Sequence, residues 1–295
     1  MKTRKHSFKH ISILRSILTY VILLIFCVLV LMPFGIILFT SLKPLNEANQ
    51  LPFTFFPNEF DFSSYIEILS NKNVWRGLVN TLIVVVPVMF IGVFVSSLAA
   101  YAFAKLKFKG KNILFSILIA SMMLPGVITM TPAYVLFDKI GWVNTWYPLM
   151  VPGMFGTAAC IFFMRNYLVR IPNELIDAGK VDGLSNFSIF LRIVLPIIKP
   201  AIVAQIILWF FAGYNDYFGP MIYLDSQNIF TLQLFLTTFA DQHVGDIPTN
   251  MATCVFSLIP ALVVYALAQK ALIRGISLQG VKKCKNLINY RSFGY

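Results

Sequence analysis

Six apolar segments of membrane length dominate the sequence and constrain its fold more than any other feature. They cover residues 18–40, 78–104, 113–137, 145–167, 201–223 and 251–273. A helix needs about 20 apolar residues to cross a bilayer. The chain of 295 residues is 58% hydrophobic and only 12% charged. This composition excludes a soluble domain and predicts an all-α integral membrane protein with six transmembrane helices.

The positions of the basic residues predict the orientation of these spans. Twenty of the 24 Lys and Arg residues fall in residues 1–15, after the second span, around the fourth-to-fifth connection, or from residue 270 onward. Positive charge beside helix ends marks the cytoplasmic side. We therefore expect both termini in the cytoplasm, with basic tails at 1–15 and 276–295 flanking a membrane domain at 16–275. The net charge of +12 then reflects topology, and no nucleic-acid partner is expected.

The connection at residues 172–200 is the longest moderately polar stretch between apolar segments. Asn173 is a favourable N-cap for a first helix, and Gly183 stands where a glycine stop belongs. Ser185 can cap a second helix, which we expect Pro196 to end. The third apolar segment contains Pro125 and Pro132, and both are predicted to break that helix.

This connection resembles the EAA loop of the membrane subunits of bacterial ABC importers. The residues at the motif positions are Glu174, Leu175, Asp177, Ala178, Gly179, Asp182, Gly183, Leu195, Pro196 and Pro200. Asp177, Gly179 and Leu184 depart from the usual Glu, Ala and Ala. In that family the loop is a coupling helix that docks into a groove on a separate ATPase subunit. A generic amphipathic loop on the membrane surface is the alternative.

Further stretches resemble the carbohydrate branch of the family, in particular the smaller permease of maltose-type importers. They are Ser41 to Pro44, the run AYAFAKLKFKGK from Ala100, and Asn215-Asp216 in the fifth span. The tail ISLQGVKK from Ile276 matches the family ending only loosely. The resemblance implies a type I ABC importer permease in a bacterial plasma or inner membrane. Its partners would be a second permease subunit, an ATPase dimer, an extracytoplasmic sugar-binding protein, membrane lipid and a sugar, preferably an oligosaccharide.

The resemblance assigns roles to two groups of residues. Docking to the ATPase is expected from the loop residues Glu174, Asp177, Ala178, Gly179, Asp182 and Gly183, with the small residues at 178 and 179 allowing close approach. A wall of the sugar path is expected from Tyr214, Asn215 and Asp216. Asp216 is the one acidic residue deep in an apolar segment, where a charge usually faces a cavity or a partner. Pairing with another helix or subunit is an equal alternative for it.

The sequence lacks the patterns that would make the chain catalytic. It contains no G-x-x-x-x-G-K-[ST] phosphate loop, no H-E-x-x-H and no C-x-x-C. We therefore expect no catalytic residue, metal or cofactor on this chain, with ATP and Mg²⁺ held by the partner ATPase. The alternatives are an ABC permease for another solute, a secondary transporter working without ATP, and a membrane enzyme. One buried Asp and the absence of a clear repeat disfavour the secondary transporter.

Overall fold

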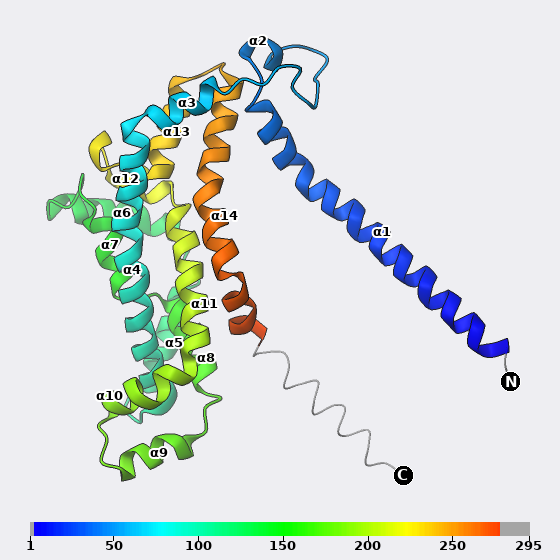
Figure 1. The fold of residues 1–295 in the computed structure, drawn as a ribbon. Helices are drawn as coiled ribbons and strands as arrows, with labels where there is room; N and C mark the ends of the chain where they lie inside the picture. The colour runs from blue at the N-terminus through cyan, green and yellow to red at the C-terminus, as the bar shows by residue number, and fades with distance from the viewer. Residues whose placement is uncertain (1–2, 278–295) are drawn as a thin grey trace. The chain divides into compact units, whose positions relative to one another are not determined.

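The computed structural model describes the backbone of residues 3–277 and the side chains of residues 16–270, and it contains no strand in that part of the chain. This confirms the predicted all-α class. The helices, drawn in Figure 1, are α1 Thr3–Thr40, α2 Leu45–Ala48, α3 Ser63–Ser70, α4 Lys72–Lys105, α5 Lys111–Ser121, α6 Gly126–Lys139, α7 Tyr147–Met154, α8 Ala158–Leu168, α9 Asn173–Val181, α10 Asn186–Ile189, the π-helix η1 Phe190–Val194, α11 Leu195–Tyr214, α12 Phe218–Tyr223, the 3-10 turn η2 Gln227–Ile229, α13 Leu232–Gln242 and α14 Ile247–Ser277.

Apolar helices occur at all six predicted positions within the described residues, and at five of them a helix reaches membrane length. Five are long and apolar enough to cross a bilayer: Ser16–Thr40, Lys72–Lys105, Tyr147–Leu168, Asn186–Tyr214 and Ile247–Lys270. The sixth position is the pair α5 and α6, which is bent by 97° at a short break. The fifth helix covers Asn186–Tyr214 instead of the predicted 201–223. It begins earlier because it includes the turns before residue 195, and it ends at Tyr214.

Prolines interrupt the helices at fewer places than predicted. Pro125 lies in extended conformation at the N-cap of α6, so the break expected there is confirmed. The break expected at Pro132 is wrong, because α6 runs through it. The stop expected at Pro196 is also wrong, because helix continues from α10 through η1 into α11. The π-helical turn η1 ends at Val194, so Pro196 falls in the first turn of α11, where a residue that lacks an N–H is tolerated.

The fourth span contains an interruption that sequence reasoning missed. Gly156 has a φ of +88° between α7 and α8, and the Thr157 side chain accepts a hydrogen bond from the Cys160 amide at 3.3 Å to start α8. A Cβ atom at Gly156 would lie 2.5 Å from Ser96 Oγ of α4. Glycine is therefore needed at this position for two reasons: it adopts the positive φ of the turn, and it leaves room for the close approach to α4.

The chain divides into two compact units, the larger of which comprises residues 72–237 and 259–295. In this unit α4 packs along α7, α8 and α11 (Figure 1). Its core includes Val93, Ala100, Met164 and Val194, which are fully buried. Small residues on α4 permit this close packing, as expected for helices in lipid.

The smaller unit comprises residues 1–71 and 238–258. Its segment 41–62 is organised around the buried Lys43, whose Nζ donates to Thr54 Oγ1 at 2.8 Å and lies 3.9 Å from Glu47 Oε1. Ser41 Oγ is 2.6 Å from the Tyr65 hydroxyl. Lys43 and Ser41 belong to the stretch from Ser41 to Pro44, so within the chain these residues fix the fold of this segment. Four of its five phenylalanines are exposed, namely Phe53, Phe56, Phe60 and Phe62, and Phe55 is half-buried.

Candidate functional site

The short helix α9 lies where the coupling helix was predicted. It ends at a glycine turn: Gly183 has a φ of +77°, its amide donates to the Lys180 carbonyl, and the Leu184 amide donates to the Gly179 carbonyl, both at 3.0 Å. This confirms the expected stop, because glycine adopts a positive φ without strain. The Ser185 side chain accepts from the Ser188 amide at 3.2 Å, so the expected cap of the next helix is confirmed as well.

The inner face of α9 rests on α10 and η1 of the same chain. Ile176 and Gly179 are buried. A Cβ atom at Gly179 would lie 2.8 Å from Ile193 Cδ1 and 3.1 Å from Ile189 Cγ1. The absence of a side chain at Gly179 thus makes room for the chain's own isoleucines. Ala178, the neighbouring small residue, is exposed.

The outer face of α9 combines apolar and acidic side chains. Leu175 and Val181 are 43% and 88% exposed, and Ala178 lies between them on the helix. The exposed acidic residues of this segment are Glu174, Asp177 and Asp182. Asp177 pairs with Lys180 at 3.0 Å, but both side chains are exposed, so the pair adds little stability. An exposed apolar stripe with acidic borders on a helix carrying few internal contacts is suited to binding another protein.

A lysine at the end of α4 contacts the start of α9. Lys105 Nζ donates to the Ile171 carbonyl and to Asn173 Oδ1, the latter at 2.9 Å. The N-cap role expected for Asn173 is wrong: Pro172 occupies the N-cap, and Asn173 is the first helical residue. Its side chain is instead turned to Lys105, a contact between residues 68 positions apart that no local sequence pattern signals.

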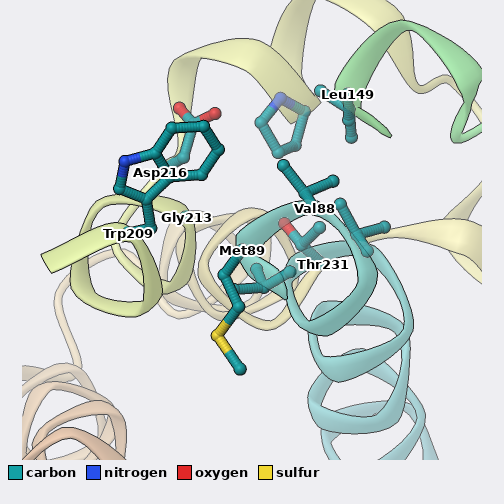
Figure 2. Close-up of a pocket in the computed structure, with 10 residues that line it drawn as sticks. Val88, Met89, Leu149, Trp209, Gly213, Asp216 and Thr231 are labelled. Atoms are coloured by element: carbon teal, nitrogen blue, oxygen red, sulfur yellow. The ribbon is translucent and has the colours of Figure 1, made fainter. Parts of the chain in front are cut away.

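A small cavity lies between α4, α7, α11 and α12 in the larger unit (Figure 2). It measures about 70 Å³ and is lined by Val84, Val85, Val88, Met89, Leu149, Trp209, Gly213, Asp216, Pro220 and Thr231. Its walls are apolar apart from Asp216 and Thr231. Pockets that hold small molecules typically measure about 300–1,000 Å³, so this cavity is too small for a sugar.

Only one of the three residues predicted for the sugar path lines this cavity. Asp216 does so, while its Oδ1 also accepts from the Gly219 amide at 3.1 Å and thereby starts α12. Tyr214 is buried and stacked on Phe210. Asn215 donates to the Phe211 carbonyl at 2.9 Å and is exposed. The three neighbours in sequence therefore point to different surroundings.

Two further cavity residues escaped sequence reasoning. Trp209 of α11 is one of them, and its ring lines the cavity. Thr231 is 5% exposed, and its hydroxyl has no hydrogen-bond partner within the described part of the chain. The nearby Thr81 Oγ1 instead accepts from the Leu232 amide at 2.8 Å. A buried hydroxyl without a partner is uncommon and marks a position where a polar ligand or water can bind.

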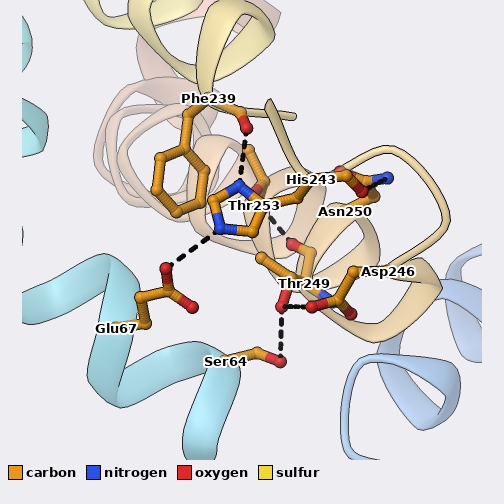
Figure 3. A network of polar contacts seen from close by, with 8 residues as sticks. All are labelled: Ser64, Glu67, Phe239, His243, Asp246, Thr249, Asn250 and Thr253. Atoms are coloured by element: carbon orange, nitrogen blue, oxygen red, sulfur yellow. Dashed lines mark hydrogen bonds and ion pairs between the residues drawn. The ribbon is translucent and has the colours of Figure 1, made fainter. Parts of the chain in front are cut away.

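A separate polar network connects α3 with the turn before α14 in the smaller unit (Figure 3). His243 Nε2 lies 3.0 Å from Glu67 Oε1, and its Nδ1 lies 2.8 Å from the Phe239 carbonyl. The Thr249 hydroxyl is 3.0 Å from that of Ser64. The hydrogen bond to the Phe239 carbonyl, together with Glu67 and Asp246, raises the pKa of His243 against the opposing effect of burial. Among the described residues no group of three or more His, Cys, Asp or Glu side chains could hold a metal ion.

Residues 92–278 match the family described as "binding-protein-dependent transport system inner membrane component". The chain is 34% identical over 86% of its length to a probable ABC transporter permease protein, PH1036, of Pyrococcus horikoshii, and spans 93% of that protein. It is 29% identical over 92% of its length to the arabinooligosaccharides transport system permease protein AraQ of Bacillus subtilis, and spans 97% of it.

Two solved structures share the fold. One is a crystal structure of a bacterial ABC transporter involved in the import of the acidic polysaccharide alginate, with a TM-score of 0.76 at 25% identity, covering 87% of this chain and 96% of the other. The second is a bacterial alginate ABC transporter in complex with its pentasaccharide-bound periplasmic protein, with a TM-score of 0.60 at 14% identity over 90% and 94% of the two chains. Both support the predicted ABC importer permease architecture. The chain therefore belongs to the family of binding-protein-dependent transport system inner membrane components.

Proposed function

We propose that this chain is the permease subunit of an ATP-driven, binding-protein-dependent importer of oligosaccharides. Family membership makes it a multi-pass transport component of the membrane. The preference for sugar oligomers rests on relatives named for arabinooligosaccharide and alginate transport. The subunit forms half of the translocation path, and a second, homologous permease forms the other half.

The observation that carries this proposal is the outer face of α9. The stripe of Leu175, Ala178 and Val181 is exposed, whereas the opposite face is fixed on the chain's own helices. This face is the docking surface for an ATPase subunit. ATP and Mg²⁺ bind to that partner, and this chain itself is not catalytic. Glu174, Asp177 and Asp182 contribute polar contacts at the border, and Gly183 supplies the turn.

The proposal places both termini, the loop 106–110 and α9 in the cytoplasm. The excess of Lys and Arg in these stretches supports this orientation. The exposed segment 51–62 then faces the outside, where the sugar-binding protein delivers its ligand. A cysteine in place of Lys109 should react with a membrane-impermeant thiol reagent only in inside-out vesicles. A cysteine in place of Leu51, which is 92% exposed, should react only in right-side-out vesicles.

Asp216 is the residue that we assign to the sugar path. Its carboxylate and the Thr231 hydroxyl are the polar groups of a cavity whose other walls are apolar and include the Trp209 ring. Aromatic faces combined with a few polar groups are common in small-molecule sites. Since about 70 Å³ is too small for a sugar, the cavity is the closed form of this part of the path. Tyr214 and Asn215 support Asp216 without lining the cavity.

The docking face is tested by introducing the same bulky residue on opposite sides of α9. Ala178→Trp covers the outer stripe. Lys180→Trp lies two residues on, about 160° around the helix, and serves as the matched control. Each variant is expressed with the operon partners, solubilised gently and purified through a tag on this chain. We expect Ala178→Trp to lose the ATPase and the uptake of the oligosaccharide, while Lys180→Trp keeps both.

Membrane abundance and thermal midpoint should be equal for the two variants. If Ala178→Trp retains the ATPase at the level of Lys180→Trp, the docking assignment is wrong. If the wild-type chain purifies alone and transports as a homo-oligomer without ATP, the importer function itself is wrong and a secondary transporter replaces it.

A further inference from the structure

We propose that Lys105 is a positioning residue that attaches the coupling helix α9 to α4, so that displacement of α9 by the ATPase moves the wall of the cavity. The inference rests on the proposed function and adds a residue to it. Lys105 lies outside the EAA-like loop, on a different transmembrane helix, within the run from Ala100 that also resembles the family. Its place in the mechanism is argued from its contacts.

The first observation is where the Lys105 ammonium binds. It donates to the Ile171 carbonyl and to Asn173 Oδ1, the residues on either side of Pro172 at the entry to α9. Pro172 has no N–H and provides no side-chain cap. Lys105 cannot replace a cap, because an ammonium group only donates hydrogen bonds, but it gives the entry to α9 a polar contact with another helix. A hydrogen bond from an ammonium group is stronger than one between neutral groups.

The second observation is what the other end of this connection contacts. Lys105 is the last residue of α4, and Val84, Val85, Val88 and Met89 of the same helix line the cavity. Met89 lies sixteen residues before Lys105, which is about 24 Å along an α-helix. α4 is continuous between these positions, so a pull on its end is transmitted to the cavity without a flexible joint.

The third observation is that α9 has a second attachment of another kind. Gly179 packs on Ile189 and Ile193, and these residues lead directly into α11, which contributes Trp209 and Gly213 to the cavity. α9 is thus connected to both helices that line the cavity, through the covalent path to α11 and through Lys105 to α4. Without the lysine, movement of α9 would reach α4 only indirectly, through the packing of α4 on α8 and α11.

The test compares Lys105→Met, which keeps the length of the side chain but not its charge, with Lys105→Arg and with Lys109→Met. Lys109 is an exposed lysine just beyond α4 and controls for loss of one positive charge. Uptake per ATP hydrolysed is measured on the purified complex in proteoliposomes. We expect roughly a tenfold loss for Lys105→Met, the factor that corresponds to one charged hydrogen bond, with Lys105→Arg close to wild type and Lys109→Met unchanged.

Two further readouts separate positioning from a general structural role. Spin labels on cysteines replacing Lys107 and Lys180, both exposed, should give a narrow distance distribution in wild type and a broad one with Lys105→Met. Asn173→Ala should reduce coupling on its own but add nothing to Lys105→Met. ATPase co-purification should stay at the wild-type level throughout, which distinguishes failure of this inference from failure of the docking proposal.

Unchanged uptake per ATP with Lys105→Met would overturn the inference, as would an unchanged spin-label distribution. Equal losses with Lys105→Met and Lys109→Met would show a charge effect only and would also overturn it. If Lys105→Met fails to assemble, Asn173→Ala carries the test, because it removes one acceptor at an exposed position. Wild-type coupling in that variant would then count against the assignment.

Discussion

Gly92 of α4 lies at the closest contact among the helices that surround the cavity, and Gly92→Ala is the sharpest test of this packing. A Cβ atom there would lie 2.3 Å from Trp209 Cζ3 of α11 and 2.5 Å from the carbonyl oxygen of Gly153 in α7. Both separations are far below van der Waals contact. The tryptophan can move only by shifting its whole ring, and the carbonyl only by shifting the backbone of α7.

The expected loss follows from two opposing effects. Alanine improves helix propensity by about 1 kcal/mol over glycine. Overpacking of a close-packed interior costs about 1–3 kcal/mol, or more where backbone must move. Because one of the two clashing atoms belongs to the backbone, we place the clash at the upper end. The net result is a loss of about 2 kcal/mol in the free energy of unfolding, or about 4–8 °C in the thermal midpoint.

The assay is the thermal midpoint of the detergent-solubilised protein, followed by loss of the monodisperse peak in size-exclusion chromatography. Gly126→Ala is the control, because a Cβ atom there would meet nothing within 4 Å. Trp209→Phe removes the ring atoms that clash and should reduce the effect of Gly92→Ala, although the Gly153 carbonyl remains. A midpoint for Gly92→Ala equal to that of Gly126→Ala would refute the packing described for α4, α7 and α11.

Three other substitutions test separate parts of the molecule. Since the pKa of His243 is raised, its protonation stabilises the fold at low pH and this contribution is lost as pH rises through the raised value. The midpoint advantage of wild type over His243→Gln should therefore be larger at about pH 6 than at about pH 9, and a constant difference would contradict the ion pair with Glu67. Asp216→Asn can keep the hydrogen bond that starts α12, so we expect an altered KM for uptake with an unchanged thermal midpoint. Asp216→Ala should alter the KM and also lower the free energy of unfolding by about 1 kcal/mol. Gly183→Ala should lower the free energy of unfolding by about 1–2 kcal/mol because of the positive φ, even though the space around Gly183 is open. Gly183→Asn should lower it less, and equal thermal midpoints for the two variants would argue against backbone strain.

Features that depend on local sequence were predictable. The six apolar segments, the break at Pro125, the glycine turn at Gly183 and the cap at Ser185 each follow from composition or spacing within a few residues. They are confirmed because the physical cause lies in the same stretch as the structure it produces. The same holds for the existence of α9, whose mixture of polar and apolar residues is bounded by two apolar spans.

Features that depend on packing between helices were not predictable. Asn173 has the chemistry of an N-cap, but Lys105 from a distant helix uses its side chain. Gly179 was expected to face a partner, yet it faces Ile189 and Ile193. Pro196 would end an isolated helix, whereas here the helix continues through the π-helical turn η1. In each case the residue type permits two roles. The choice between them depends on contacts with another helix or on the local hydrogen-bonding pattern of the backbone, and the sequence pattern shows neither.

The two attachments of α9 differ in a way that bears on how the cavity can change. The contact of Gly179 with Ile189 and Ile193 is close apolar packing, which tolerates little displacement. Lys105 holds the start of α9 through hydrogen bonds from one ammonium group with rotatable donors, so the angle between α9 and α4 can change while the two helix ends stay together. A force on the outer face of α9 is therefore expected to tilt this helix about its Gly179 end and to move its Asn173 end relative to η1. Because Lys105 follows that end, α4 moves relative to α11, and the cavity between Met89 and Trp209 changes shape in step with the docking of the ATPase.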